Sequence, residues 1–159
     1  RDTSLEAETN VLNPQAHHPN QGRWRGGPVF TRDEARTWAS IVLMSGGSVF
    51  FSDRIAMLNE EGREMLRRAV APTGIAAVPL DLCEEERASL WLQKLPGETR
   101  LTAINWREEP REVAFRFAGH GLPAPAQVTD FWTDEVTEVR DGRLDLRLAP
   151  HACAVLRWQ

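Results

Sequence analysis

Hydrophobic and polar positions follow two rhythms along this 159-residue chain, and the change falls near residue 80. Before that point, apolar residues recur at the spacing of one helical face. After it, short segments of alternating apolar and polar residues follow one another about every ten residues, which is typical of a β-sandwich or β-barrel. The pattern predicts a helical part followed by an antiparallel sheet.

The helical part contains two predicted helices. The first begins at the capping box Thr31-Arg-Asp-Glu34 and ends at the glycine pair 46–47, where a left-handed residue can close it. Its expected inward stripe is Trp38, Ile41, Val42 and Ser45. The second follows Asn59, a residue type favoured at the N-cap, and ends before Pro72. Its expected inward stripe is Met65, Leu66, Ala69 and Val70.

Between the two helices lies Ser48-Val-Phe-Phe-Ser52, which is apolar on consecutive positions and so predicts a parallel strand buried on both faces. Such a strand needs hydrogen-bonding neighbours, and the sequence offers no second strand-helix unit to supply them. We therefore expect residues 30–72 to be the last strand-helix unit of a larger α/β domain. Residues 1–30 are rich in turn signals and are expected to be mostly irregular.

The second part of the chain predicts an antiparallel sheet structure. Its expected strands are Ile75–Leu80, Ser89–Leu95, Arg100–Trp106, Glu112–Phe117, Gln127–Trp132, Glu135–Val139, Arg143–Leu148 and Ala152–Trp158. The seventh of these alternates strictly between charged and apolar side chains, as in a sheet with one face in water. Asp141-Gly142 before it predicts a two-residue hairpin, whose central residues need positive φ. Four tryptophans are expected in the core or on a sheet face: Trp91, Trp106, Trp132 and Trp158.

Composition narrows the function classes. The net charge is −4 with both signs interspersed, which argues against a nucleic-acid surface. No apolar run approaches the ~20 residues of a membrane-spanning helix, so no membrane partner is expected. The four histidines and two cysteines lack paired ligand spacing, and we expect no metal site. A disulfide between Cys83 and Cys153 is left open. The sequence also lacks a phosphate loop and a dinucleotide fingerprint.

Several stretches resemble one enzyme family, and the first of them are residues 31–53, 58–66 and 79–82. They are similar to the end of the catalytic barrel of α-galactosidase-type glycoside hydrolases, families 27 and 36 (melibiase type). Those similar to the β-sandwich after that barrel are Ile104-Asn-Trp106, Asp130-Phe-Trp-Thr133 and Leu148–Leu156. The resemblance implies an α+β fragment. Residues 1–74 would be the C-terminal remnant of a (β/α)8 barrel, and residues 75–159 an antiparallel β-sandwich accessory domain.

The resemblance also implies an activity. In this family the barrel hydrolyses α-linked galactosides with retention, using one Asp as nucleophile and a second as acid/base, without metal or organic cofactor. The strand with the nucleophile would lie before residue 1. Asp2 is the candidate acid/base residue, since Arg1-Asp2-Thr3 is similar to the end of that motif. With one carboxylate missing, the chain alone is expected to be inactive.

Four further residues are candidates for binding substrate. Ser52 and Asp53 end the predicted buried strand, where ligands of α/β domains gather, and they match a Ser-Asp of the family near the sugar. Trp24 is either a sugar-stacking platform or a loop anchor. Arg25 opens the segment 25–30, where the family carries two carboxylates that this sequence lacks. Galactose is therefore not assumed to be the sugar.

Other interpretations stay open. The chain is alternatively a non-catalytic β-sandwich module that binds carbohydrate or braces a partner domain, and tryptophans exposed along one sheet face would favour sugar binding. A third hypothesis is that residues 1–72 find their missing strand neighbours in a second copy of the chain, which would make a homo-oligomer. The expected partners are otherwise a carbohydrate substrate and the remainder of the barrel.

Overall fold

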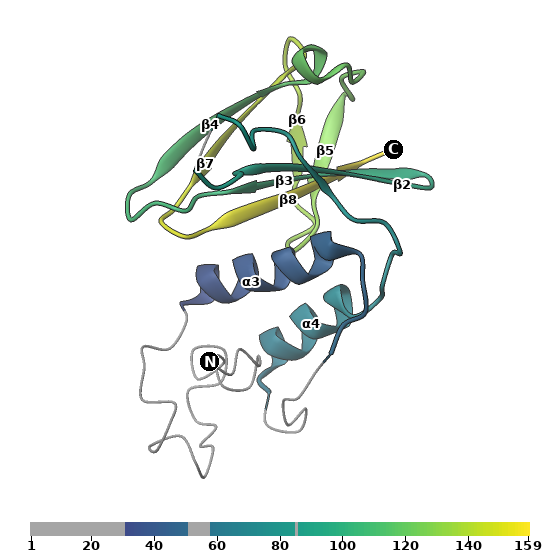
Figure 1. The fold of residues 1–159 in the computed structure, drawn as a ribbon, viewed down its shortest axis with the longest axis vertical. Coiled ribbons are helices and arrows are strands. Elements are labelled where there is room, and N and C mark those ends of the chain that lie inside the picture. The colour runs from purple at the N-terminus through teal and green to yellow at the C-terminus, as the bar shows by residue number, and fades with distance from the viewer. Residues whose placement is uncertain (1–30, 51–57, 85) are drawn as a thin grey trace.

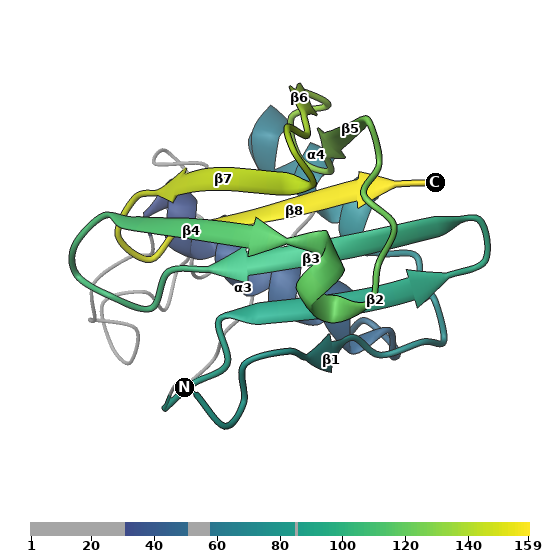
Figure 2. The same ribbon diagram turned by 90° about the horizontal axis from the view of Figure 1, so that it is seen from above.

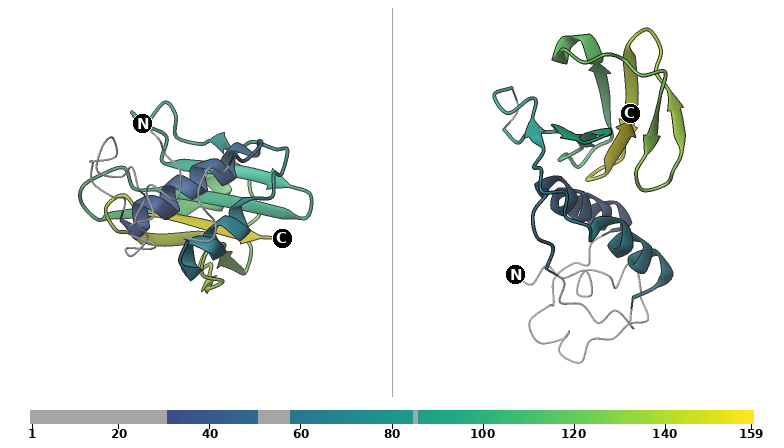
Figure 3. Two further views of the ribbon diagram at one scale, coloured as in Figure 1. Left: turned by 90° about the horizontal axis from the view of Figure 1, so that it is seen from below. Right: turned by 90° about the vertical axis from the view of Figure 1, so that its right-hand side faces the viewer.

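The computed structural model describes residues 31–50, 58–84 and 86–159. Within these ranges the fold has three layers: two α-helices, a six-stranded sheet and a two-stranded sheet (Figure 1). The helices are α3 (Arg32–Ser45) and α4 (Glu60–Ala69). They cover the face of the six-stranded sheet that points away from the two-stranded sheet, as Figure 3 shows from below and from the side. The sheet is thus packed on both faces.

All strand pairs in the described residues are antiparallel. The six-stranded sheet has the order β1-β2-β3-β8-β5-β6, and β4 pairs with β7 in the second sheet. Figure 2 shows β4 and β7 lying over β3 and β8. The bounds are Val78–Pro79 (β1), Leu90–Leu95 (β2), Glu98–Ile104 (β3), Arg111–Arg116 (β4), Gln127–Asp130 (β5), Val136–Glu138 (β6), Arg143–Leu148 (β7) and Cys153–Trp158 (β8). The predicted strands are confirmed, with ends that shift by a few residues.

Aromatic rings fill the space between the two sheets. Phe115 and Phe117 are fully buried and pack edge to face, with ring centroids 5.1 Å apart. Trp158 adds a second edge-to-face contact with Phe117 at 5.4 Å. Leu101 and Leu156, from neighbouring strands β3 and β8, pack into the same cluster. This core depends on the period-two alternation that the sequence shows.

The predicted hairpin carries the chain from one sheet to the other. Asp141 and Gly142 have φ of 52° and 67°, as the two-residue turn requires. Two backbone hydrogen bonds between Arg140 and Arg143, of 3.1 and 2.8 Å, close the turn. Since β6 and β7 belong to different sheets, this turn helps to set how the sheets face each other.

Helix α3 begins and ends as predicted, but it buries a different face. Thr31 and Glu34 make both hydrogen bonds of the capping box, and Gly46 ends the helix at φ 66°. The predicted inward stripe is wrong: its three apolar members are only half-buried and Ser45 is exposed. The residues that are buried are Ala35, Thr37, Ala39, Ser40, Leu43 and Met44. Small side chains let the helix backbone approach the sheet, and this contact outweighs the burial of bulkier residues.

Helix α4 follows its prediction more closely. The Asn59 side chain accepts a hydrogen bond of 2.7 Å from the amide of Gly62, which caps the helix. Met65 and Ala69 are buried against the other elements. Leu66 is half-buried, and Val70, at the C-cap, is exposed.

The buried parallel strand predicted at residues 48–52 is not found in its described part. Residues 48–50 have no regular secondary structure, and 94% of Phe50 is exposed. The prediction is wrong for these residues in this chain, while Phe51 and Ser52 lie outside the described residues. A parallel strand cannot form without a neighbour, and the strands that surround this segment in the described chain pair among themselves.

Gly46, which ends α3, lies against the segment that connects α4 to the sheet. Its carbonyl accepts a hydrogen bond of 2.8 Å from Gly74, and a Cβ at Gly46 would lie 2.2 Å from the carbonyl oxygen of Ile75. Gly74 has a similar φ of 72° with nothing within 4 Å of its Cβ position. A side chain at either glycine would strain the backbone, but only one at Gly46 would also clash with a neighbour.

We predict that Gly46→Ala lowers the free energy of unfolding by at least about 2 kcal/mol, because strain and clash add. Gly74→Ala serves as the control and is expected to cost about 1–2 kcal/mol from strain alone. Urea unfolding followed by circular dichroism measures both variants. Equal losses in the two variants would show that the close approach to Ile75 is unimportant.

Candidate functional site

The residues predicted to react with or bind substrate lie outside the described residues. These are Asp2, Trp24, Arg25, Ser52 and Asp53. Their roles stay predictions. In the described ranges, no cluster of three or more His, Cys, Asp or Glu side chains is placed to hold a metal ion. No helix there combines the length and hydropathy needed to cross a bilayer.

A buried set of polar groups fastens α3 to the sheet, and we call it the helix–sheet joint (Thr37, Ser40, Trp132, Cys153 and the His151 carbonyl). The Ser40 hydroxyl accepts a hydrogen bond of 2.9 Å from the Trp132 indole and donates one of 2.8 Å to the carbonyl of Arg36. Thr37 donates to the His151 carbonyl at 2.7 Å. Each of these buried groups therefore has a partner, as burial requires.

Cys153 lies at the centre of the joint. Its Sγ is 3.2 Å from the Ser40 hydroxyl oxygen, and burial raises the pKa of the thiol above its ordinary value. The thiol therefore stays protonated and packs as a small, weakly polar side chain. Both Cys153 and the exposed Cys83 are free, so the open question of a disulfide is answered in the negative.

The motifs that carry the family resemblance build and support this joint. Asp130 Oδ1 accepts hydrogen bonds from the amides of Trp132 (2.8 Å) and Thr133 (2.9 Å), which holds the turn that presents the Trp132 ring. Asn105 is fully buried and donates to the carbonyls of Glu109 (2.7 Å) and Ala149 (2.8 Å), which ties β3 to the segment before β8. These residues position elements of the fold.

Ion pairs connect α4 to the sheet at the rim of the joint. Arg68 pairs with Glu64 of its own helix at 2.6 Å and with Asp134 of the β5–β6 turn at 2.5 Å. Asp134 in turn pairs with Arg157 of β8 at 2.8 Å. Hydrogen bonds from Arg67 and Arg68 lower the pKa of Glu64 from 4.5 to about 2. The pKa of Asp134 is also lowered, first by the hydrogen bond from Arg68.

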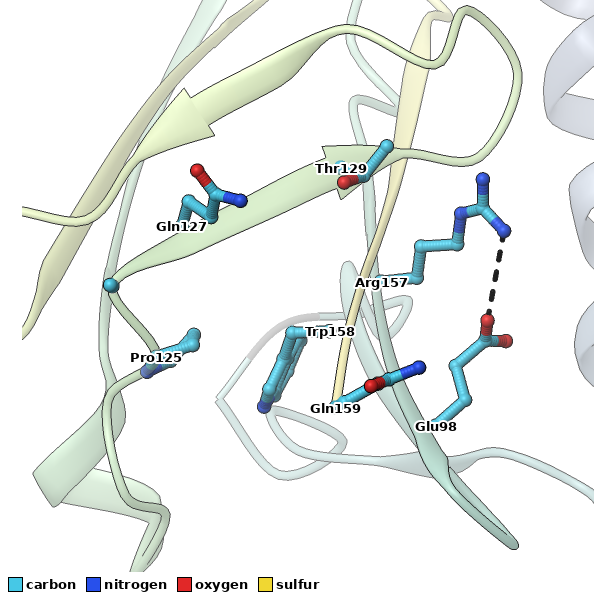
Figure 4. Close-up of a pocket in the computed structure, with 8 residues that line it drawn as sticks. Glu98, Pro125, Gln127, Thr129, Arg157, Trp158 and Gln159 are labelled. Atoms are coloured by element: carbon cyan, nitrogen blue, oxygen red, sulfur yellow. Dashed lines mark ion pairs between the residues drawn. The ribbon is translucent and has the colours of Figure 1, made fainter.

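A cavity of about 520 Å³ opens where strands β5 and β8 diverge, and we call it the β5–β8 cleft (Figure 4). Only two residue pairs join these strands, Thr129 with Arg157 and Asp130 with Leu156. Beyond the first pair the strands separate and leave the cleft between them. Its lining residues are Glu98, Pro125, Ala126, Gln127, Thr129, Arg157, Trp158 and Gln159.

The cleft has an aromatic ring, neutral polar side chains and a compensated ion pair. Trp158 is half-buried and anchored on Phe117, so its ring is held at the wall. Arg157 lies 3.8 Å from Glu98, which also pairs with Arg100 at 2.5 Å. Glu98 is the single carboxylate side chain among the lining residues, whereas a retaining glycosidase needs two carboxyl groups about 5–5.5 Å apart. The described lining of the cleft therefore does not supply the carboxyl pair of a retaining glycosidase.

The four tryptophans of the sheet part do not form an exposed row. Trp132 is buried, and Trp91, Trp106 and Trp158 are half-buried. The indoles of Trp91 and Trp106 both donate to the Ala88 carbonyl, at 3.1 and 2.9 Å. The sheet therefore lacks, in its described residues, the row of exposed tryptophans along one face that was expected of a sugar-binding module. Of these four tryptophans, Trp158 lines the β5–β8 cleft.

Residues 85–158 match the family described as the alpha galactosidase C-terminal beta sandwich domain. This sandwich is an α-galactosidase C-terminal domain. Its family match covers the strands β2 to β8, together with the joint residues Trp132 and Cys153. No curated protein matches the chain.

Solved structures share the fold of the α-galactosidase C-terminal domain and of the helices before it. A Bacteroides fragilis protein assigned as an alpha-galactosidase/melibiase aligns with a TM-score of 0.71 at 15% identity, over 85% of this chain and 30% of its own. A GH27 β-L-arabinopyranosidase from Geobacillus stearothermophilus gives 0.62 at 18% identity, over 80% and 30%. Alpha-galactosidase I from Mortierella vinacea gives 0.62 at 12%, over 85% and 37%. The chain thus spans about a third of the length of these enzymes, and the likeness concerns the fold.

Sequence reasoning missed the β5–β8 cleft of the α-galactosidase C-terminal domain. It placed Trp158 in the core or on a sheet face and gave no role to Gln127, Thr129 or Arg157. Two of these three side chains are uncharged, and the cavity arises from the separation of two strands that are far apart in sequence. The one available signal was an aromatic residue at the very end of a strand with an arginine before it.

We predict that Ser40→Ala lowers the free energy of unfolding by about 1–3 kcal/mol, because it leaves the Trp132 indole N–H buried without an acceptor. The matched control is Ser45→Ala on the same helix. Ser45 is exposed and bonds only to its own turn, so the control should change stability by less than about 0.5 kcal/mol. Urea unfolding measures both variants. A loss no greater than that of the control would show that the joint does not hold the helix.

The lowered pKa of Glu64 predicts a dependence of stability on pH. A carboxyl whose folded pKa is depressed contributes stability that is fully present above its unfolded pKa, near 4.5, and is lost as the pH falls toward 2. The difference in thermal midpoint between the native chain and Glu64→Gln should therefore be largest at pH 7 and vanish near pH 2. Glu138→Gln, in an exposed pair 3.4 Å from Arg140, is the control and should show little difference at either pH. A difference that does not change with pH would contradict the ion-pair origin.

Proposed function

We propose that this chain is the C-terminal portion of a retaining glycoside hydrolase that acts on α-glycosides. Residues 1–74 are the end of its (β/α)8 barrel, and residues 75–159 are the accessory β-sandwich. The partners of the chain are then the remainder of the barrel and a carbohydrate substrate. The family match over residues 85–158 and the shared fold with α-galactosidases support this proposal.

The helix–sheet joint is the observation that carries the proposal. Ser40, Trp132 and Cys153 join a helix to the outer face of a β-sandwich through buried hydrogen bonds. A sandwich attached in this way braces the helices that precede it. The fold relatives cover the helices as well as the sheets, because 80–85% of this chain aligns with them while the family match begins only at residue 85.

The other side of α3 supports the same role. Trp38, Ile41 and Val42 are half-buried, so this side of the helix is apolar although it does not face the sandwich core. A helix with apolar side chains on more than one face is typical of an element packed between two layers. We propose that the second layer is the barrel. In this arrangement Ser52 and Asp53 stand at the carboxyl end of the last barrel strand, near the sugar, and Trp24 and Arg25 line the same site.

A second candidate function, carbohydrate binding by the sandwich itself, is favoured by one specific observation. The β5–β8 cleft combines a fixed tryptophan ring with neutral polar side chains. This function does not exclude the first, since accessory and binding roles use different surfaces.

We predict that the 159 residues alone do not hydrolyse 4-nitrophenyl α-glycosides, because a retaining mechanism needs both a nucleophile and an acid/base carboxyl. A polypeptide in which these residues follow a complete barrel should hydrolyse at least one of the α-galactoside and α-N-acetylgalactosaminide substrates. Release of 4-nitrophenol measures turnover, and proton NMR of the first sugar released should show retention at the anomeric carbon.

Two controls make this experiment decisive. Asp53→Asn in the longer polypeptide should raise KM, whereas Asp33→Asn, in the first turn of α3, should leave KM unchanged. Turnover by the 159 residues alone would overturn the proposal that catalysis requires the remainder of the barrel. Release of an inverted sugar by the longer polypeptide would overturn the retaining mechanism.

A further inference from the structure

We propose that the β5–β8 cleft is a non-catalytic binding site for a small neutral saccharide. The site lies on the sandwich, with all its lining residues in β3, β5, β8 and the segments that flank them. It is separate from Ser52 and Asp53 in sequence and from the helix–sheet joint in structure. The inference does not require the glycosidase activity proposed above.

The ring of Trp158 provides a fixed stacking surface. It makes an edge-to-face contact with Phe117, with an interplanar angle of 79° and centroids 5.4 Å apart, and Phe117 is fully buried. Figure 4 shows the ring standing in the cleft with Pro125 on the opposite wall. A ring already held by the core loses little rotational freedom on binding, which favours affinity. The C–H groups of a pyranose can pack on such an apolar ring face.

Two neutral side chains of the lining, Gln127 and Thr129, can supply hydrogen bonds. Gln127 and Thr129 project from β5 on the same side of the cleft (Figure 4). Among the described residues no side-chain hydrogen bond to another protein group engages either one. An amide and a hydroxyl each donate and accept, and sugar hydroxyls need both. The lining of the cleft thus combines an apolar ring with neutral hydrogen-bonding groups, which is the composition expected of a saccharide site.

The charged side chains that line the cleft already take part in ion pairs. Glu98 is paired with Arg100 and Arg157, and Arg157 is also paired with Asp134 at 2.8 Å. An ionic ligand would have to break or compete with these pairs, whereas a neutral ligand leaves them in place. The cavity of about 520 Å³ falls within the ~300–1,000 Å³ range of small-molecule sites. We therefore assign a neutral saccharide and not a charged metabolite.

NMR of the 159-residue chain tests this assignment. The chain has six tryptophans, each with an indole N–H signal in a ¹H–¹⁵N spectrum. Titration with melibiose or isomaltotriose should move the Trp158 indole signal saturably, while the signal of the buried Trp132 stays in place. Sorbitol, which carries hydroxyls without a ring to stack, should move neither signal at the same concentrations.

Variants at Gln127 and Thr129 provide the decisive comparison. Gln127→Ala and Thr129→Val should each raise the Kd by about fivefold or more, since each removes one net hydrogen bond. Thr137→Val, on the exposed neighbouring strand β6, is the matched control and should leave the Kd unchanged. Thr129→Ser keeps the hydroxyl and should bind as the native chain does. Unchanged positions of the other indole signals report that each variant is folded.

Three results would overturn the proposal. The first is a Trp158 signal that neither saccharide shifts. The second is a shift of equal size with sorbitol, which would indicate general solvent effects. The third is saccharide binding that Gln127→Ala and Thr129→Val leave intact, which would place the ligand elsewhere. None of these results bears on turnover by the longer polypeptide, so failure of the saccharide site and failure of the glycosidase proposal are distinguishable.

Discussion

The close packing of α3 on the outer face of the six-stranded sheet is the contact on which the rest of the structure depends. Ala35 and Ala39 are almost fully buried and present no bulk, so the helix backbone comes near the sheet. Only at this separation can the Ser40 hydroxyl reach both the Trp132 indole and the Cys153 thiol. Helix α4 then packs against α3, and Arg68 reaches the β5–β6 turn. A bulkier residue at Ala39 would separate all of these groups together, because they share one spacing.

The joint separates neutral and charged groups by depth. Its centre holds a serine, a threonine, a thiol and an indole, whose hydrogen bonds satisfy buried atoms without burying charge. Its rim holds the arginine and carboxylate side chains of α4, β8 and the β5–β6 turn, where water still screens them. The centre therefore contributes stability that depends little on salt or pH. The rim orients α4 and contributes stability that protonation of Glu64 and Asp134 removes.

Local signals in the sequence predicted most of the fold, and tertiary contacts decided the rest. The capping box at Thr31, the N-cap at Asn59 and the Asp141-Gly142 turn were predictable because each depends on residues within one turn of chain. The buried face of α3 was not, since the helix carries apolar residues on more than one face and the partner sheet selects among them. The strand predicted at residues 48–52 is not found in its described part, residues 48–50, for a related reason: a hydrophobic run specifies burial, but pairing needs a neighbouring strand.

The same logic explains why the cleft escaped sequence reasoning and why it is compatible with a bracing role. Residues 128 and 156 lie in the sandwich core, yet the strands that carry them stay paired over only two residue pairs before they diverge. Nothing in either segment alone encodes that separation. Arg157 contributes to both the joint and the cleft. Its ion pair with Asp134 directs the guanidinium toward the rim of the joint, and Arg100 holds Glu98 by a second ion pair. The charges that border the cleft are thus committed to the architecture, which leaves the indole of Trp158 and the neutral groups of Gln127 and Thr129 to select the ligand.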